Sequence, residues 1–169
     1  MYLVVTVDTE EDNWDRYHIK KSSVSNIEKI PILQGLFAEY DVKPSYVITY
    51  PVASNETSVK ILRNIYEDGR AEIGAHLHPW STPPYDEESN AKNSMLCNLS
   101  SELQSKKIKV LHETIISNFK LMPTIFKAGR WAFNHAIANN ISKLGYKIDI
   151  SITPYVDWSY CHGPDYSIL

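Results

Sequence analysis

The pattern that most constrains the fold is an alternation of short apolar, β-branched runs with longer amphipathic segments along the 169 residues. Apolar runs of four to eight residues predict buried strands, and apolar residues three and four positions apart predict helices. The predicted strands cover 2–7, 44–50, 71–75, 124–128 and 146–152, and the predicted helices cover 25–40, 55–68, 100–119 and 134–145. Because strands that alternate with helices pair in parallel, the sequence predicts an α/β fold.

The composition of the predicted strands narrows the architecture further. They are continuous apolar runs, which is typical of a parallel sheet covered on both faces or of a barrel wall. No glycine-rich phosphate loop follows any of them, which argues against a nucleotide-binding open sheet. A complete eight-stranded barrel takes about 250 residues. We therefore expect a distorted or incomplete (β/α) barrel with fewer than eight parallel strands, formed by one domain over 1–169 that is either partly open or truncated at its C-terminal end.

Charge and cysteine content exclude several classes of protein. The chain has 17 Lys and Arg against 20 Asp and Glu, so it lacks the positive charge that nucleic-acid binding requires. Its apolar runs are too short to span a membrane, and it opens without the basic leader of a signal peptide. Two cysteines do not make a disulfide framework. These features predict a cytoplasmic protein with no nucleic-acid or membrane partner.

Two carboxylates follow the first predicted strand. Asp8 and Glu10 alternate, so in an extended chain both side chains point to the same side. Such a pair can divide the work of a hydrolase, with one carboxylate on a metal ion and the other as a base. The alternative is that Asp8 caps a turn and that Glu10 belongs to a solvated acidic loop.

A His-x-His pair at the end of the third predicted strand gives the sharper signal. His76 and His78 face the same way on an extended segment, so two imidazoles can bind one ion. Imidazole nitrogens together with a carboxylate oxygen are typical of catalytic zinc sites. The carboxyl ends of parallel strands meet at one rim, which predicts that Glu10, His76 and His78 hold a divalent cation, with zinc as the expected metal. The alternative is a pair of surface or core histidines.

The fourth and fifth predicted strands add an arginine and aromatic residues to the same rim. Arg130 can clamp a carboxylate and hold a catalytic Asp in one orientation, or it can pack over Trp131 or contact substrate. Asp157 can orient Arg130, and Trp158 offers an apolar wall or plain packing. Aromatic rings near loop ends can stack on sugar rings, or they can serve only as packing. The residues expected to bind substrate are Trp80, Trp131, Asp157 and Trp158.

The order of these motifs resembles that of the polysaccharide deacetylases of the NodB-homology type. Four segments carry the resemblance, namely Val-Thr-Val-Asp-Thr-Glu at 5–10, Glu-Ile-Gly-Ala-His at 72–76, Ala-Gly-Arg at 128–130 and Asp-Trp at 157–158. The family implies a distorted (β/α) barrel with fewer than eight strands, a divalent metal that is usually zinc, and removal of acetyl groups from the amide nitrogen of N-acetylated sugars.

The resemblance also assigns roles to individual residues. Asp8 matches the catalytic base of the family, Arg130 matches the arginine that positions this base, and His76 matches the first metal histidine. Glu10 stands at the position of the metal carboxylate. The second family histidine comes four residues after the first, where this sequence has Trp80, so His78 is its substitute.

The function expected from these residues is metal-dependent hydrolysis of an acyl amide on a carbohydrate. The family's last motif, a Leu-x-His that supplies the general acid, is missing, and His162 is a candidate substitute. Two alternatives stay open. One is another metal-dependent amidohydrolase or phosphoesterase, and the other is a carbohydrate-binding relative without catalysis.

Overall fold

Five parallel strands form one sheet in the computed structural model, which describes residues 3–12 and 23–169. The strands pair in chain order, with β1 and β5 at the two edges. Their bounds are Thr6–Thr9 for β1, Ser45–Ile48 for β2, Glu72–Leu77 for β3, Ile125–Ala128 for β4 and Ile148–Asp149 for β5. The predicted α/β class with fewer than eight parallel strands is confirmed.

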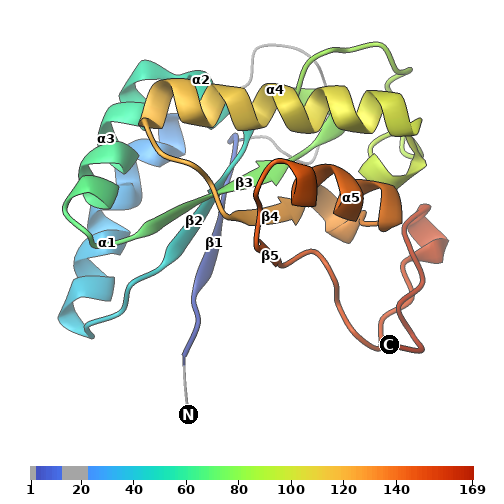
Figure 1. Cartoon of the computed structure of the whole chain (residues 1–169). Coiled ribbons are helices and arrows are strands. Elements are labelled where there is room, and N and C mark those ends of the chain that lie inside the picture. The colour runs from blue at the N-terminus through green and yellow to red at the C-terminus, as the bar shows by residue number, and fades with distance from the viewer. Residues whose placement is uncertain (1–2, 13–22) are drawn as a thin grey trace.

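Helices connect the strands and lie together on one side of the sheet (Figure 1). The α-helices are α1 (Ile30–Glu39), α2 (Tyr50–Ser54), α3 (Glu56–Glu67), α4 (Ser101–Phe119) and α5 (His135–Lys143). Short 3-10 helices are η2 (Ser25–Lys29), η3 (Pro79–Ser81), η4 (Leu96–Asn98), η5 (Gly129–Trp131) and η6 (Ser159–Cys161). Asn55, Ser100 and Asn134 accept a backbone hydrogen bond at the first turns of α3, α4 and α5, which confirms the helix starts expected there.

The two faces of the sheet differ because successive side chains point in opposite directions. One face packs against the helices and forms the hydrophobic core, with Tyr46, Ile73, Ala75, Leu77 and Phe126 among its members. The positions between these residues face the other way. On that second face Asp8 pairs with Val47, and Val47 pairs with Gly74. Two residues further along the strands, His76 pairs with Lys127.

The second face is concave. Asp8 on β1 and Lys127 on β4 are separated by two strands, so in a flat sheet their backbones would be roughly 14 Å apart. The Lys127 ammonium nevertheless lies 2.5 Å from an Asp8 carboxylate oxygen. The sheet therefore curls toward this face, as the wall of a barrel does.

The strand boundaries differ from those expected. β1 begins at Thr6, and Leu3 and Val4 ahead of it are exposed rather than buried in a strand, while Tyr2 lies outside the described residues. β3 extends to Leu77, so His76 lies inside the strand rather than after it. β5 is only two residues long. Across the described segments, no helix is both long and apolar enough to cross a membrane.

Candidate metal centre

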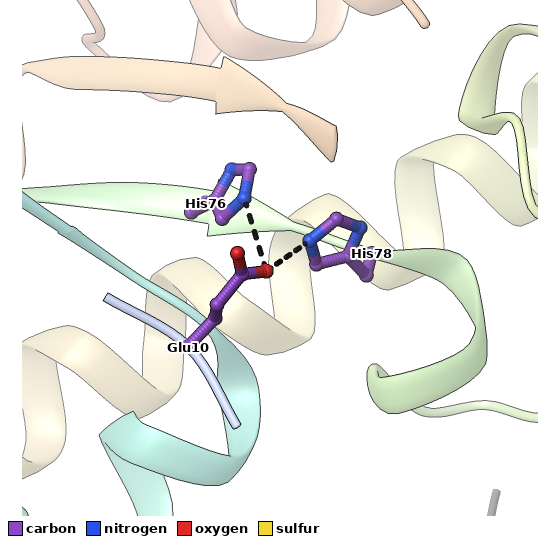
Figure 2. Close-up of side chains that lie close together, drawn as sticks. All are labelled: Glu10, His76 and His78. Atoms are coloured by element: carbon purple, nitrogen blue, oxygen red, sulfur yellow. Dashed lines mark hydrogen bonds and ion pairs between the residues drawn. The ribbon is translucent and has the colours of Figure 1, made fainter. Parts of the chain in front are cut away.

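Glu10, His76 and His78 lie together at the concave face, where β1 and β3 end (Figure 2). One ligand atom from each lies within 4.8 Å of the other two. The Nε2 atom of His78 is 2.7 Å from Oε2 of Glu10, and Nε2 of His76 is 3.7 Å from the same oxygen. The structure thus brings together the three residues that the sequence named as metal ligands.

Hydrogen bonds from the first turn of η2 hold the segment that carries Glu10. Asn26 donates through its side-chain amide to the Glu10 carbonyl at 2.9 Å. The Asp12 carboxylate accepts from the backbone of Ser25 and Asn26 and from the Ser25 hydroxyl, at 2.7 to 3.2 Å. Asp12 is exposed, but it caps the first turn of η2, and this contact holds the backbone on which Glu10 sits.

The imidazole rings are held by packing. Nδ1 of His76 lies 3.3 Å from the Lys127 carbonyl, so that its N–H points there and Nε2 faces Glu10. The ring of His78 lies against Trp80, with centroids 4.1 Å apart, and against Gly129. A Cβ atom at Gly129 would fall 2.1 Å from Nδ1 of His78. Only a glycine lets the backbone after β4 approach this ring.

Burial and hydrogen bonding shift the pKa values of His78 and Glu10. Burial lowers the pKa of His78 below its ordinary value, reinforced by the neighbouring His76, and the contact with Glu10 opposes this only in part. Burial alone would raise the pKa of Glu10, but the hydrogen bonds to His76 and His78 outweigh it and lower that pKa to about 2. Glu10 is therefore ionised at neutral pH, and burial favours the neutral imidazole at His78. A carboxylate together with imidazole nitrogens is a donor set typical of divalent cations.

Asp8 has a different cationic partner from the one expected. Both of its carboxylate oxygens accept from the Lys127 ammonium, at 2.5 and 2.8 Å. Arg130, which the sequence predicted to hold Asp8, donates to the Ser94 hydroxyl and lies 3.5 Å from the Ala91 carbonyl. The expectation is corrected on this point because Lys127 shares the concave face with Asp8, whereas Arg130 lies past the end of β4, in η5.

Two of the four tryptophans form a stacked pair. The rings of Trp131 and Trp158 are 4.3 Å apart and nearly parallel, at 9°. Arg130 and Trp131 both adopt left-handed backbone conformations, with φ of 55° and 57°. The buried Tyr166 hydroxyl donates to the Trp131 carbonyl at 2.7 Å, which helps to hold this turn. Consecutive left-handed residues other than glycine cost free energy and are typical of functional turns.

Two residues predicted to bind substrate have other surroundings. Trp80 is only 4% exposed and packs on His78, so its ring has almost no surface to offer a sugar. Asp157 is exposed and accepts from the Ser159 backbone at 2.8 Å. His162, the candidate acid, is exposed at the end of η6.

Sequence reasoning missed Lys127, and for Gly129 it indicated only that a small residue allows close backbone approach. Lys127 is one residue inside an apolar strand, and its register with His76 is the only signal that would have placed it on the same face. The importance of Gly129 depends on a ring from a distant loop, which no local pattern reveals.

Comparison with known proteins gives a consistent fold. No protein-family model and no curated protein matches the chain. Among solved structures, it is similar to a chitin deacetylase from the fungal pathogen Colletotrichum lindemuthianum, with a TM-score of 0.57 and 16% identity over 86% of this chain and 53% of that one. It is also similar to a family 4 carbohydrate esterase from Streptomyces lividans in complex with acetate, with a TM-score of 0.59 and 12% identity over 94% of this chain and 67% of that one.

A third similar structure is a mutant of a CE4 family pseudoenzyme with restored enzymatic activity. Its TM-score is 0.60 and its identity 15%, over 93% of this chain and 47% of that one. The chain spans 47% to 67% of the length of these three solved structures. At these identities the likeness establishes the fold alone, a parallel sheet with helices arranged as in these deacetylase and esterase structures.

Proposed function

We propose that the chain is a metal-dependent deacetylase that removes an acyl group, typically acetyl, from an amide nitrogen on a carbohydrate. The observation that carries the proposal is the convergence of Glu10, His76 and His78 at the concave face. Asp8 lies two residues before Glu10 on the same face and supports the assignment of a separate base.

The residues present fit a divalent cation. Glu10 contributes a carboxylate, and His76 and His78 turn Nε2 toward it, with each ring held by a protein contact on its other side. A set of two imidazoles and one carboxylate is typical of hydrolytic zinc sites. When bound, such an ion would polarise the acyl carbonyl and lower the pKa of a water molecule.

The protein groups around the site suit amide hydrolysis. Asp8 would take the proton of the attacking water, and the Lys127 ammonium would hold the carboxylate in one orientation. Water adds to the carbonyl carbon and gives one proton to Asp8, the carbon–nitrogen bond breaks, and that proton passes to the departing nitrogen, so that acetate and an amine leave. The stacked pair of Trp131 and Trp158 would supply an aromatic face for the sugar.

A second candidate function is carbohydrate binding without catalysis. The aromatic pair favours it because the stack does not depend on the metal-ligand group. Under this alternative the fold would bind a sugar through Trp131 and Trp158, and His76 and His78 would be core residues.

The proposal is tested with purified full-length chain loaded with Zn²⁺ or Co²⁺. We expect one ion per chain by elemental analysis, and acetate release from oligomers of N-acetylglucosamine that stops on chelation. His76→Ala should abolish both. Acetate release that survives His76→Ala would refute the ligand assignment. Sugar binding by a chain that holds no metal ion and releases no acetate would favour the second candidate. Phosphate release from phosphoesters would instead indicate a phosphoesterase.

A further inference from the structure

The middle of α4 carries a lysine with no solvent exposure. Lys107 is 0% exposed, although lysine is among the residues least often buried. Its ammonium group donates to three backbone carbonyls, those of Pro79 at 2.9 Å and of Thr82 and Pro84 at 2.7 Å. It also forms an ion pair of 2.8 Å with the Glu87 carboxylate. All four acceptors belong to the segment 79–87, which follows His78 directly; we call this segment the His78 loop.

The His78 loop has few means of holding itself. Pro79, Pro83 and Pro84 have no backbone N–H to donate. The bonds that the loop makes around η3 are long, with Ser81 N to the His78 carbonyl at 3.3 Å and Thr82 N to the Pro79 carbonyl at 3.4 Å. The buried hydroxyls of Ser81 and Thr82 have no hydrogen-bond partner within the described chain. Among the loop's polar contacts within the described residues, those to Lys107 are short, at 2.7 to 2.9 Å.

Charge balance explains why the ammonium group can be buried there. Burial lowers the pKa of Lys107, and the neighbouring Glu87 carboxylate opposes this shift. An ammonium group has three N–H donors, and here four oxygens share them. Because charge-assisted bonds are stronger than neutral ones, this one side chain connects the loop firmly to a helix that belongs to the core.

The anchored loop bears directly on the candidate metal centre. Trp80 lies in its first turn and packs on the ring of His78, at 4.1 Å between centroids and with only 4% of its surface exposed. On its other side His78 meets Gly129, so the ring is held between two surfaces. One of these surfaces is the backbone just after β4, and the other is Trp80 in the first turn of the His78 loop.

We propose that Lys107 is a positioning residue of the metal centre, which holds the His78 loop so that Trp80 keeps Nε2 of His78 facing Glu10. This rests on the proposed function as far as the metal is concerned. The anchoring of the loop itself does not depend on a bound ion. Groups outside the ligand shell commonly change metal affinity by about 10- to 100-fold when they are removed.

The test compares Lys107→Met with Lys106→Met in the full-length chain. Lys106 is the preceding residue on α4, but its ammonium is exposed and pairs with Glu102 on the same helix at 2.7 Å. We expect Lys107→Met to speed hydrogen–deuterium exchange across 79–87 and to weaken Co²⁺ binding by about tenfold, with a changed Co²⁺ absorption spectrum. Lys106→Met should leave exchange, affinity and spectrum unchanged.

Two further variants separate positioning from general destabilisation. Leu111→Ala removes a buried core side chain one turn along α4 and should lower the unfolding midpoint without changing the Co²⁺ spectrum. Glu87→Gln keeps the side-chain volume but removes the negative charge, and should change exchange and affinity in the same direction as Lys107→Met, to a smaller extent. It also tests the proposal if Lys107→Met does not fold.

Unchanged exchange across 79–87 and unchanged Co²⁺ affinity in folded Lys107→Met, or in Glu87→Gln if the first does not fold, would overturn the proposal. So would an equal loss of affinity in Leu111→Ala. If the wild-type chain binds no Co²⁺ at all, the proposed function fails by itself. Exchange in the metal-free protein then decides whether Lys107 anchors the loop.

Discussion

At the scale of single residues, the candidate metal centre depends on how closely Gly129 approaches His78. We expect Gly129→Ala to displace the His78 ring, because the added Cβ would fall 2.1 Å from Nδ1. The loss of one ligand from its place should weaken Zn²⁺ binding by about tenfold or more, measured by competition with a chelator of known affinity.

Gly35→Ala is the matched control for this substitution. Gly35 lies inside α1 with no atom within 4 Å of the position its Cβ would take. We expect this variant to bind Zn²⁺ as the wild type does and to gain about 0.5 to 1 kcal/mol of stability, since alanine replaces glycine within a helix. Equal Zn²⁺ affinities in the two variants would show that His78 is not a ligand.

Lys127 is the second residue on which the proposed chemistry depends. Lys127→Met removes the ammonium that contacts both carboxylate oxygens of Asp8. We expect kcat for acetate release to fall about 100-fold, at the low end of what general acid–base catalysis contributes, while Zn²⁺ affinity is kept. Steady-state kinetics and metal titration measure the two effects separately.

The controls for this prediction are another lysine and a conservative change. Lys43 forms an ion pair of 2.6 Å with Glu72, but both side chains are about half exposed, so Lys43→Met should leave kcat unchanged. Lys127→Arg retains a cation and should recover part of the activity. If Lys127→Met were as active as the wild type, Asp8 would not be a base that requires this partner.

At the scale of secondary-structure elements, α4 carries both core side chains and the anchor of the His78 loop. Its first turn is capped by Ser100, whose hydroxyl accepts from the Leu103 backbone at 3.2 Å. Ser100→Ala should lower the free energy of unfolding by about 1 kcal/mol, as measured by urea denaturation. Ser101→Ala, one residue further on, makes no cap and should change stability by less than about 0.5 kcal/mol. Equal losses in both would contradict the cap.

The strands show how local periodicity places a site. Because side chains alternate, Asp8 and Glu10 share one face of β1 and its extension, and Gly74, His76 and His78 share one face of β3 and its extension. The parallel pairing through β2 then puts both sets on the concave face. The metal-ligand group therefore follows from the alternation of side chains along β1 and along β3, and from the parallel pairing of both strands with β2.

At the scale of the whole molecule, metal binding should be linked to stability. A ligand at 100 times its Kd that binds only the folded state stabilises it by about 2.7 kcal/mol. For a chain of this length that corresponds to a rise in Tm of roughly 5 to 10 °C. We expect added Zn²⁺ to produce this rise in a thermal melt and a chelator to reverse it.

His76→Ala should abolish the rise in Tm, whereas His135→Ala should keep it, because His135 is an exposed residue of α5. A Zn²⁺-dependent rise that persists in His76→Ala would mean that the ion binds elsewhere. No rise in the wild-type chain would contradict metal binding at this concentration.

The sequence by itself determined the order of strands and helices and the cap at Asn134. It also predicted helix starts at Asn55 and at Ser100 or Ser101, and it named Glu10, His76 and His78, which the fold brings together. These depend on local periodicity, capping and residue chemistry, which are all readable along the chain. The sequence predicted the bounds of β1 and β5 poorly, because the length of an edge strand depends on its pairing with a single neighbouring strand.

Only the tertiary structure decided which cation faces Asp8 and which tryptophan is buried. The curl of the sheet brings Lys127 across two strands to Asp8, and the anchored His78 loop buries Trp80 while Trp131 and Trp158 stack on each other. Spacing along the chain tells to which side of its own element a side chain points. It does not tell which side chains from other elements will meet it there, since curvature and loop packing are set by contacts between residues far apart in sequence.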